Sequence, residues 1–470
     1  MEKINWLDEV LKRKNELIVD TQEFLRIKSV LDEENGTSAA PFGEGIDKAL
    51  HYLLEKGSDD GFTAKNLDGL AAHLEMGNGE ELLGILCHID VVPEGDGWTS
   101  DPYGAEIRDG KIFARGALDD KGPTMAAYYA MKIVKELNLP LAKRVRMIIG
   151  TDEESDWRCV DHYFKHEEMP TMGFAPDADF PIIYAEKGIV DFDFVQHSIS
   201  ETNDSGLKLD FLQAGRRYNM VPDFAEAKIQ GHGDLQKIVN EYNEFLQQHS
   251  LQGRGLCDED TLLLQLEGVS AHGMEPDHGK NAGLLLASFL YRYQFDKAAQ
   301  DFLHFTNEFF VGDSRGKSLG VAYSDDITDD LTINVGKLTY TTESGGSLGL
   351  NLRYPVTNDI TETKKKLEDV CGKATFKLEN YSNSNPHHVD KDHTLIKTLQ
   401  KVYEEQTGDE PTLVSIGGGT YARSLEAGVA FGPLFPGRPD IAHQKDEYII
   451  IEDLIKATAI YAQAIYELAK

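Results

Sequence analysis

The chain has few cysteines and few cations for its size. Its 470 residues include four cysteines, Cys87, Cys159, Cys257 and Cys371, and none of them forms a C-x-x-C pair. A disulfide framework would be denser, so we expect reduced thiols and a cytoplasmic protein. Lys and Arg total 47 against 80 for Asp and Glu, which gives a formal net charge of −33. Such a surface repels polyphosphates and anionic membranes, so we expect neither nucleic-acid nor membrane partners.

Long apolar runs, short-period repeats and low-complexity tracts are also missing. No stretch approaches the ~20 apolar residues of a membrane span, and the first residues have no apolar signal core. Between Trp6 and Val19 apolar residues instead recur at helical spacing, which predicts an amphipathic helix. The length exceeds what one hydrophobic core usually serves, so we expect two domains.

Short apolar runs that end in polar residues mark the first part of the chain. Leu82–Cys87 leads directly into His88, Val145–Ile149 is followed by Thr151–Glu154, and a third run ends near Asp177. The segment 123–137 between the first two runs is typical of a helix with proline near its start. In an α/β sheet, ligands gather beyond the carboxyl ends of the strands. The three runs therefore predict one site at a sheet edge.

The middle of the chain has a different pattern. Residues 187–378 are rich in period-two alternation, as in Ile189–Val195, and also contain helical stretches such as Leu235–Leu246. The α/β pattern returns near residue 391. We therefore expect an α/β domain made of residues 1–186 and 379–470, interrupted by an inserted α+β domain at 187–378.

Five fragments carry the side chains that two divalent metal ions need. They are His88-Ile-Asp90, Arg115–Gly122, Thr151–Glu154, Ala175–Asp177 and Ala442-His443. Two imidazoles and several carboxylates suit zinc, cobalt or manganese. The adjacent pair in Asp-Glu-Glu suggests a metal ligand beside a base, and so metal-assisted hydrolysis. Each fragment alone also fits a plainer interpretation: a histidine satisfied at a strand end, solvated acids, or a structural turn.

The five fragments in this order resemble the metallopeptidase family M20, the group that includes aminoacylase, carboxypeptidase G2 and carnosinase. The shared motifs are H-x-D, R-G-A-x-D-x-K-G, D-E-E, P-D and a late histidine, spread over most of the chain. The segments Gly268–Gly273 and Arg217–Pro222 resemble bacterial dipeptidases of that family. The resemblance implies a mixed-sheet α/β catalytic domain of the di-zinc exopeptidase type, with an inserted α+β lid domain.

The resemblance also implies a ligand set for two zinc ions per chain, with Co²⁺ or Mn²⁺ as substitutes. His88 and Asp177 would bind one ion, Glu154 and His443 the other, and Asp119 would bridge the two.

Two further acids receive roles from the same resemblance. Glu153 would be the general base and later the proton donor to the leaving amine, and Asp90 would orient a metal ligand from behind. The peptide bond after the bridging Asp119 is expected to be cis, as is common in the family.

The lid would supply the groups that hold the substrate. His272 resembles the histidine that polarises the scissile carbonyl, Asn219 a hydrogen-bond donor nearby, and Arg353 the arginine that grips the substrate carboxylate. A loop histidine and a surface strand arginine are the plainer alternatives. Gly418 and Thr420 would approach the substrate backbone, or form a simple turn. This glycine-rich segment lacks the Lys and Ser/Thr spacing of a phosphate loop.

The function that follows is hydrolysis of dipeptides with a free amino terminus, including β-alanyl dipeptides. The alternatives are an N-acyl amino-acid deacylase or desuccinylase of the same family, a non-catalytic metal or peptide binder, and an acidic structural protein. The insert is longer than the lid of the dimeric family members, so one chain could supply its own histidine. We therefore expect a monomer.

Overall fold

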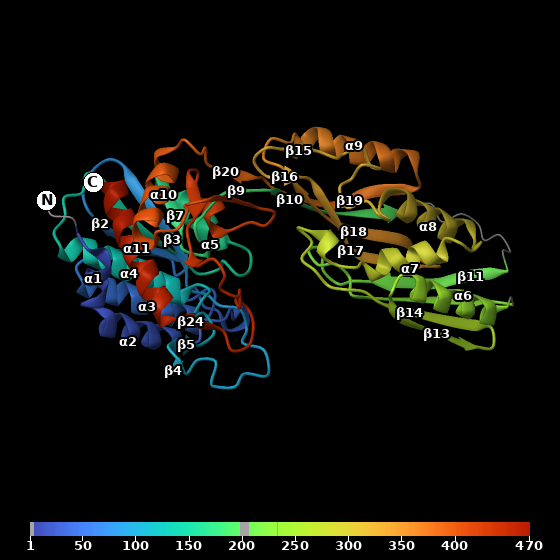
Figure 1. Cartoon of the computed structure of the whole chain (residues 1–470), viewed down its shortest axis with the longest axis horizontal. Coiled ribbons are helices and arrows are strands. Elements are labelled where there is room, and N and C mark those ends of the chain that lie inside the picture. Colours follow the sequence, from blue (N-terminus) through green and yellow to red (C-terminus); the bar gives the residue numbers. More distant parts are fainter. Residues whose placement is uncertain (1–3, 198–205, 233) are drawn as a thin grey trace. The chain divides into compact units, whose positions relative to one another are not determined.

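The computed structural model describes residues 4–197, 206–232 and 234–470, and these divide into two compact units (Figure 1). The first unit is Met1–Ala185, His388–Ser415 and Thr420–Lys470, and the second is Glu186–His387 and Ile416–Gly419. The boundary expected at residue 378 falls inside strand β19 (Phe376–Ser384), which pairs with β10 (Gly188–Gln196). The second unit therefore continues to His387, because this strand completes its sheet.

The first unit is built on a mixed nine-stranded sheet. Its order is β1-β2-β6-β3-β7-β22-β9-β20, with β21 beside β9. The strands are β1 (Thr63–Leu67), β2 (Ala71–Met76), β3 (Leu82–His88), β6 (Arg144–Gly150), β7 (Met172–Ala175), β9 (Ile182–Glu186), β20 (His387–His388), β21 (Leu413–Ile416) and β22 (Gly428–Ala430). Strand β3 runs parallel to β6 and β7, while β2 is antiparallel to β6. The α/β class with a mixed sheet, expected from the sequence, is confirmed.

Helices bury the central strands of this sheet, which is why those strands are apolar throughout rather than alternating. Every residue of β3 is buried. Helices α4 (Lys121–Glu136) and α11 (Ile451–Ala469) lie side by side and are themselves mostly buried (Figure 1). The other helices of the unit are α1 (Trp6–Leu11), α2 (Lys14–Leu25), α3 (Glu44–Asp59), α5 (Arg158–His166) and α10 (Thr394–Thr407).

The single amphipathic helix expected near the amino terminus is wrong. The segment forms two helices, α1 and α2, because Arg13 leaves helical geometry at φ −111° and ψ 6°. This break changes the phase of the apolar face. Leu7, Leu11 and Val19, expected on the buried side, are 38%, 47% and 50% exposed, respectively.

The second unit contains an eight-stranded antiparallel sheet in the order β13-β14-β12-β11-β17-β18-β10-β19. The remaining strands are β11 (Leu207–Ala214), β12 (Phe224–Gly231), β13 (Gln252–Asp258), β14 (Thr261–Glu267), β17 (Thr332–Thr341) and β18 (Gly345–Tyr354). Its helices share a hydrophobic core with the strands; they are α6 (Leu235–Gln248), α7 (Ala282–Leu290), α8 (Lys297–Phe309) and α9 (Ile360–Lys373). Residues in β10 alternate between buried and partly buried, as the period-two pattern predicts.

Short sheets and turns complete the molecule. A three-stranded sheet in the first unit joins β4 (Glu106–Arg108), β5 (Lys111–Phe113) and β24 (Tyr448–Ile450). Two-stranded pairs are formed by β8 (Ala178–Asp179) with β23 (Pro433–Leu434) and by β15 (Ser324–Asp325) with β16 (Asp329–Asp330). Within the described ranges, none of the helices has both the length and the apolar character needed to cross a membrane.

Candidate metal centre

Three neighbouring strands of the first unit deliver polar side chains to one edge of the sheet. His88 is the last residue of β3, Glu153 and Glu154 lie in the turn after β6, and Asp177 comes two residues after β7. Strand β3 lies between β6 and β7 and runs parallel to both, so the three carboxyl ends meet. The fold thus assembles the cluster that the strand-end pattern predicts.

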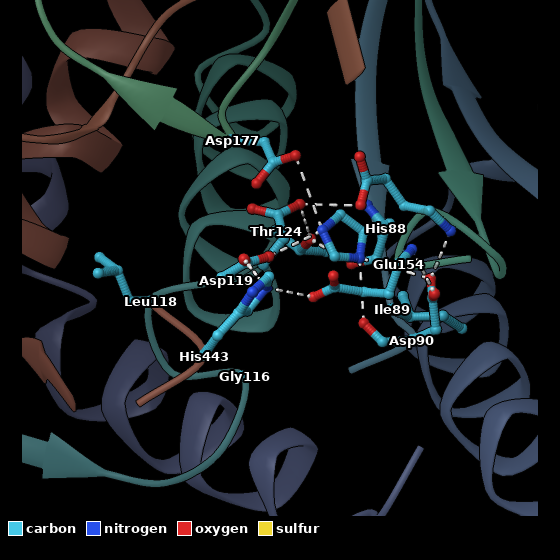
Figure 2. Close-up of polar contacts among 12 residues, drawn as sticks. His88, Ile89, Asp90, Gly116, Leu118, Asp119, Thr124, Glu154, Asp177 and His443 are labelled. Carbon is cyan, nitrogen blue, oxygen red and sulfur yellow. Dashed lines mark hydrogen bonds and ion pairs between the residues drawn. The ribbon is translucent and has the colours of Figure 1, made fainter. Parts of the chain in front are cut away.

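Two loops bring the remaining candidates to the same place. Asp119 lies just before α4, and the Asp119–Asp120 peptide bond is cis, as the resemblance leads one to expect. His443 lies in the loop before β24. One carboxylate oxygen of Asp119 is 3.0 Å from His88 Nε2 and the other is 3.0 Å from His443 Nε2. Figure 2 shows the Asp119 carboxylate between the two imidazoles.

These residues form two groups of potential ligands that share one member. His88, Asp119 and Asp177 form the first group, and Asp119, Glu154 and His443 form the second, with the potential ligand atoms of each group within 4.8 Å of one another. His88 Nε2 is 3.7 Å from Asp177 Oδ2, and His443 Nε2 is 3.0 Å from Glu154 Oε1. The pairing matches the ligand sets that the resemblance implies, with Asp119 common to both.

The spacing and charge of these groups fit divalent cations. Tetrahedral zinc with bonds of 2.0–2.2 Å holds its ligand atoms roughly 3.3 Å apart, close to the separations just given. The carboxylates of Asp119 and Glu154, which accept hydrogen bonds from His443 Nε2, raise the pKa of His443 to about 10. Burial opposes a charge on His88, yet Asp177 and Asp119 raise its pKa well above the usual value. Carboxylates that favour positive imidazoles would equally stabilise a metal ion between them.

Asp90 lies beside the His88 ring and also contacts the two adjacent glutamates. His88 Nδ1 lies 3.0 Å from the main-chain oxygen of Asp90, and that bond leaves Nε2 as the ligand atom. The Asp90 carboxylate lies 3.4 Å from His88 Nδ1, and it also accepts hydrogen bonds from the main-chain N–H of Glu153, at 3.1 Å, and of Glu154, at 3.0 Å. Asp90 therefore links His88 to the two adjacent glutamates, and Figure 2 shows its place beside His88 and Glu154.

The two glutamates differ in their surroundings. Glu154 contacts His443. Glu153 instead forms a third group of potential ligands, with His88 and Glu154. Burial raises the pKa of the Glu153 carboxyl well above its usual value, and the nearby Asp177 and Glu154 add to the effect while His88 opposes it. A carboxyl with a raised pKa holds a proton more readily than an exposed one, which suits a group that accepts a proton and then donates it.

Side chains that the sequence gave no reason to select support His88. Asp120 Oδ2 accepts a hydrogen bond from His88 N–H and another from the Thr124 hydroxyl, each at 3.1 Å. The Tyr421 ring packs edge-on against His88, with centroids 6.0 Å apart. Asp120 could have been noticed as the neighbour of Asp119, and Tyr421 as the residue after Thr420 in the glycine-rich segment, but neither residue type signals a contact with His88.

In the second unit, the structure brings His272, Asn219 and Arg353 into one neighbourhood. His272 and Met220 form an isolated antiparallel bridge. The main-chain oxygen of Asn219 accepts a hydrogen bond from the N–H of Gly273, the residue after His272. The Met274 N–H donates to His272 Nδ1 at 3.1 Å. Burial, with a contribution from Arg353, lowers the pKa of His272. The lowered pKa favours the neutral imidazole, and the hydrogen bond accepted by Nδ1 places the ring proton on Nε2.

The glycine-rich segment is divided between the units. Gly417 O accepts a hydrogen bond from Arg353 Nη1 at 3.1 Å, so this part lies beside the candidate arginine. Arg353 Nε donates to Asn351 Oδ1 at 2.7 Å, which fixes the guanidinium plane. Gly418 belongs to the second unit with Gly417, whereas Thr420 belongs to the first.

Known proteins resemble this chain over nearly its whole length. Residues 84–467 match the family model described as Peptidase family M20/M25/M40. A Bacillus subtilis (strain 168) protein named "Putative dipeptidase YtjP" is 57% identical over 468 residues, which cover 99% of this chain and 100% of the relative. A Staphylococcus epidermidis protein with the printed name "Putative dipeptidase" is 45% identical over 464 residues, 98% of this chain and 99% of the relative.

Solved structures share the fold at low sequence identity. Human carnosine dipeptidase 1 superposes with a TM-score of 0.54 at 15% identity and covers 98% of each chain. Aminoacylhistidine dipeptidase from Vibrio alginolyticus gives a TM-score of 0.58 at 14% identity and 96% coverage of each chain. These likenesses establish the mixed α/β fold.

Proposed function

The chain belongs to the peptidase family M20/M25/M40, and we propose that it is a dipeptidase that works with two divalent metal ions. The observation that carries this proposal is the pair of ligand groups sharing Asp119, one with His88 and Asp177 and the other with Glu154 and His443. A carboxylate with one oxygen toward each imidazole suits a bridge between two ions. Zinc fits the nitrogen and oxygen donors, with Co²⁺ or Mn²⁺ as substitutes.

The proposed chemistry assigns the proton transfers to Glu153. The ions, when bound, would supply Lewis acidity to the attacking water and to the scissile carbonyl. Glu153 would take a proton from the water as its oxygen bonds to the carbonyl carbon, and would pass that proton to the amine nitrogen as the C–N bond breaks. Asp90 would hold the Glu153 and Glu154 backbone in register with His88 during these steps.

His272 is proposed to stabilise the oxyanion. The hydrogen bonding of His272 supports this role. Nδ1 accepts from the Met274 N–H, so Nε2 carries the proton and a neutral imidazole can donate a hydrogen bond to the oxyanion. Arg353 is proposed to bind the substrate carboxylate, with Asn351 and Gly417 orienting its fork. Asn219 is proposed to donate a hydrogen bond near the scissile carbonyl, and Gly418 and Thr420 are proposed to approach the substrate backbone.

Substitution of His272 tests its role apart from the metal ions. We expect His272→Ala to lower kcat by about 10²–10³-fold, the usual cost of one oxyanion donor, while zinc content is unchanged. Steady-state kinetics and elemental analysis on the same preparation give both values. His278→Ala, an exposed histidine in the same segment, is the matched control and should behave as wild type. Loss of zinc from His272→Ala would make His272 a ligand instead.

A substrate panel distinguishes the dipeptidase from its alternatives. We expect turnover of dipeptides with a free amino terminus, including β-alanyl-histidine, and little turnover of N-acetyl or N-succinyl amino acids. The reverse preference would identify a deacylase or desuccinylase of the same family. Stable zinc content without turnover of either set would favour a non-catalytic binder. The monomeric state and the cytoplasmic location stay predictions.

A further inference from the structure

A buried carboxylate close to the candidate metal centre has no part in the proposed chemistry. Glu447 lies four residues after His443 and its side chain is 0% exposed. One oxygen accepts from Arg115 Nη1 at 2.6 Å and from Gly116 N–H at 3.2 Å. The other accepts from the N–H groups of Leu118, at 2.8 Å, and of Asp119, at 3.1 Å. Four donors thus converge on one carboxylate, and three of them are main-chain groups of the segment that ends in Asp119.

Arg115 extends this network to a third segment. Its side chain is 2% exposed, and Nη2 donates to the main-chain oxygen of Glu94 at 3.3 Å. Glu94 lies in the loop that follows His88 and Asp90. The Arg115 guanidinium also lies 5.3 Å from the centroid of the Trp98 ring in the same loop. One ion pair therefore touches the loop after His88, the segment before Asp119 and the segment after His443.

We propose that Arg115 and Glu447 are positioning residues, whose ion pair sets Asp119 relative to His88 and His443 and thereby fixes the separation of the two metal ions. This inference rests on the proposed function. The reason is geometric: the Glu447 carboxylate binds the N–H of Asp119 itself, so a shift of the carboxylate moves the bridging residue. Neither residue touches the proposed ligand side chains, and both would act through the backbone that carries them.

A substitution that preserves shape exposes this role. In Glu447→Gln, one oxygen can still accept from Leu118 and Asp119, but the amide N–H₂ then faces two donors, Arg115 Nη1 and Gly116 N–H. Donors cannot satisfy one another, so the segment has to move away. Groups that orient metal ligands typically contribute 10–100-fold to metal affinity.

A second ion pair in the same unit, between the buried Arg146 and the partly buried Glu75, supplies the control. Arg146 on β6 contacts Glu75 on β2 at 2.6 Å, with side chains 5% and 19% exposed. It links strands rather than the loops that carry the candidate ligands. Glu75→Gln should therefore lower the thermal unfolding temperature while leaving metal affinity as in wild type.

The experiment is a titration of the metal-free full-length protein with Co²⁺ or Zn²⁺ by calorimetry, for wild type, Glu447→Gln and Glu75→Gln, with thermal unfolding of each. We expect two ions per wild-type chain and a dissociation constant raised about 10–100-fold for at least one of them in Glu447→Gln only. Equal affinities in wild type and Glu447→Gln would overturn the inference. A wild-type protein that binds no metal would instead overturn the proposed function.

Arg115→Lys provides a second variant for the same titration. The lysine keeps a cation beside Glu447 but lacks the second guanidinium nitrogen, which binds the main-chain oxygen of Glu94 in the wild type. We therefore expect weaker metal binding in this variant too. If Glu447→Gln and Arg115→Lys both failed to fold with metal present while Glu75→Gln folded, the pair would be an element of the fold alone, and the positioning role would be rejected.

Discussion

Glu153→Ala is expected to retain its metal ions and to hydrolyse dipeptides about 10³-fold more slowly than wild type, or worse. General-base catalysis typically supplies 10²–10⁴-fold in rate, and here one residue would serve as base and then as proton donor. Metal should be retained because Glu153 lies outside the two ligand groups that share Asp119. The measurements are kcat on a dipeptide and metal per chain on the same preparation.

Two further variants show whether the loss of activity is specific to the Glu153 carboxylate. Glu153→Gln keeps the size of the side chain but cannot take up a proton, so it should be as inactive as the alanine variant. Asp156→Ala removes an acid of the same turn whose side chain is 75% exposed, and it should remain near wild type. A near wild-type rate for Glu153→Ala would remove the base assignment, and a loss of metal would show that Glu153 is a ligand.

Asp119→Asn is expected to lose metal and activity together. The variant removes one negative charge and one of the two oxygens that face His88 and His443. Metal ions contribute several kcal/mol of charge stabilisation in such reactions, which corresponds to roughly 10³-fold or more in kcat. Elemental analysis should give fewer than two ions per chain, and added zinc should restore little of the rate.

The two predictions differ in the expected metal content, because Asp119→Asn should lose metal and Glu153→Ala should keep it. Asp96→Asn, an exposed aspartate in the loop after β3, is the control for loss of a carboxylate and should keep full metal content. If Asp119→Asn bound two ions tightly and hydrolysed dipeptides at the wild-type rate, Asp119 would not be a bridging ligand.

The candidate ligands at the strand ends were the most predictable part of the site. His88, Glu154 and Asp177 each follow an apolar run, and an apolar run buried on both faces must end where its backbone reaches solvent. Parallel neighbours then bring these ends together. The alternation in β10 was readable for a related reason, since a sheet with one covered face requires it.

Residues supplied by loops were beyond pattern reasoning. Asp119 and His443 lie far apart in the chain, and only the family resemblance selected them from many acids and histidines. Tyr421, Arg115 and Glu447 carried no assigned role, because their contacts depend on how distant segments pack. The charge pattern of a sequence does not record which main-chain N–H groups converge on one carboxylate.

The error at the amino terminus is explained by a contact with a distant part of the chain. Apolar spacing from Trp6 to Val19 fits one helix, but Arg13 interrupts it and bonds Glu136 of α4 through Nε at 2.7 Å. A tertiary contact of this kind outweighs the small differences in helix propensity between residues. The insert boundary moved for a similar reason, since β19 is held by its pairing with β10.

The most direct test of a two-metal dipeptidase is dipeptide hydrolysis by the purified protein before chelation, after chelation and after metal is returned. We expect activity to be abolished by the chelator and restored by zinc, cobalt or manganese, reaching its full value at about two ions per chain. Undiminished hydrolysis by protein shown to be free of metal would contradict the account.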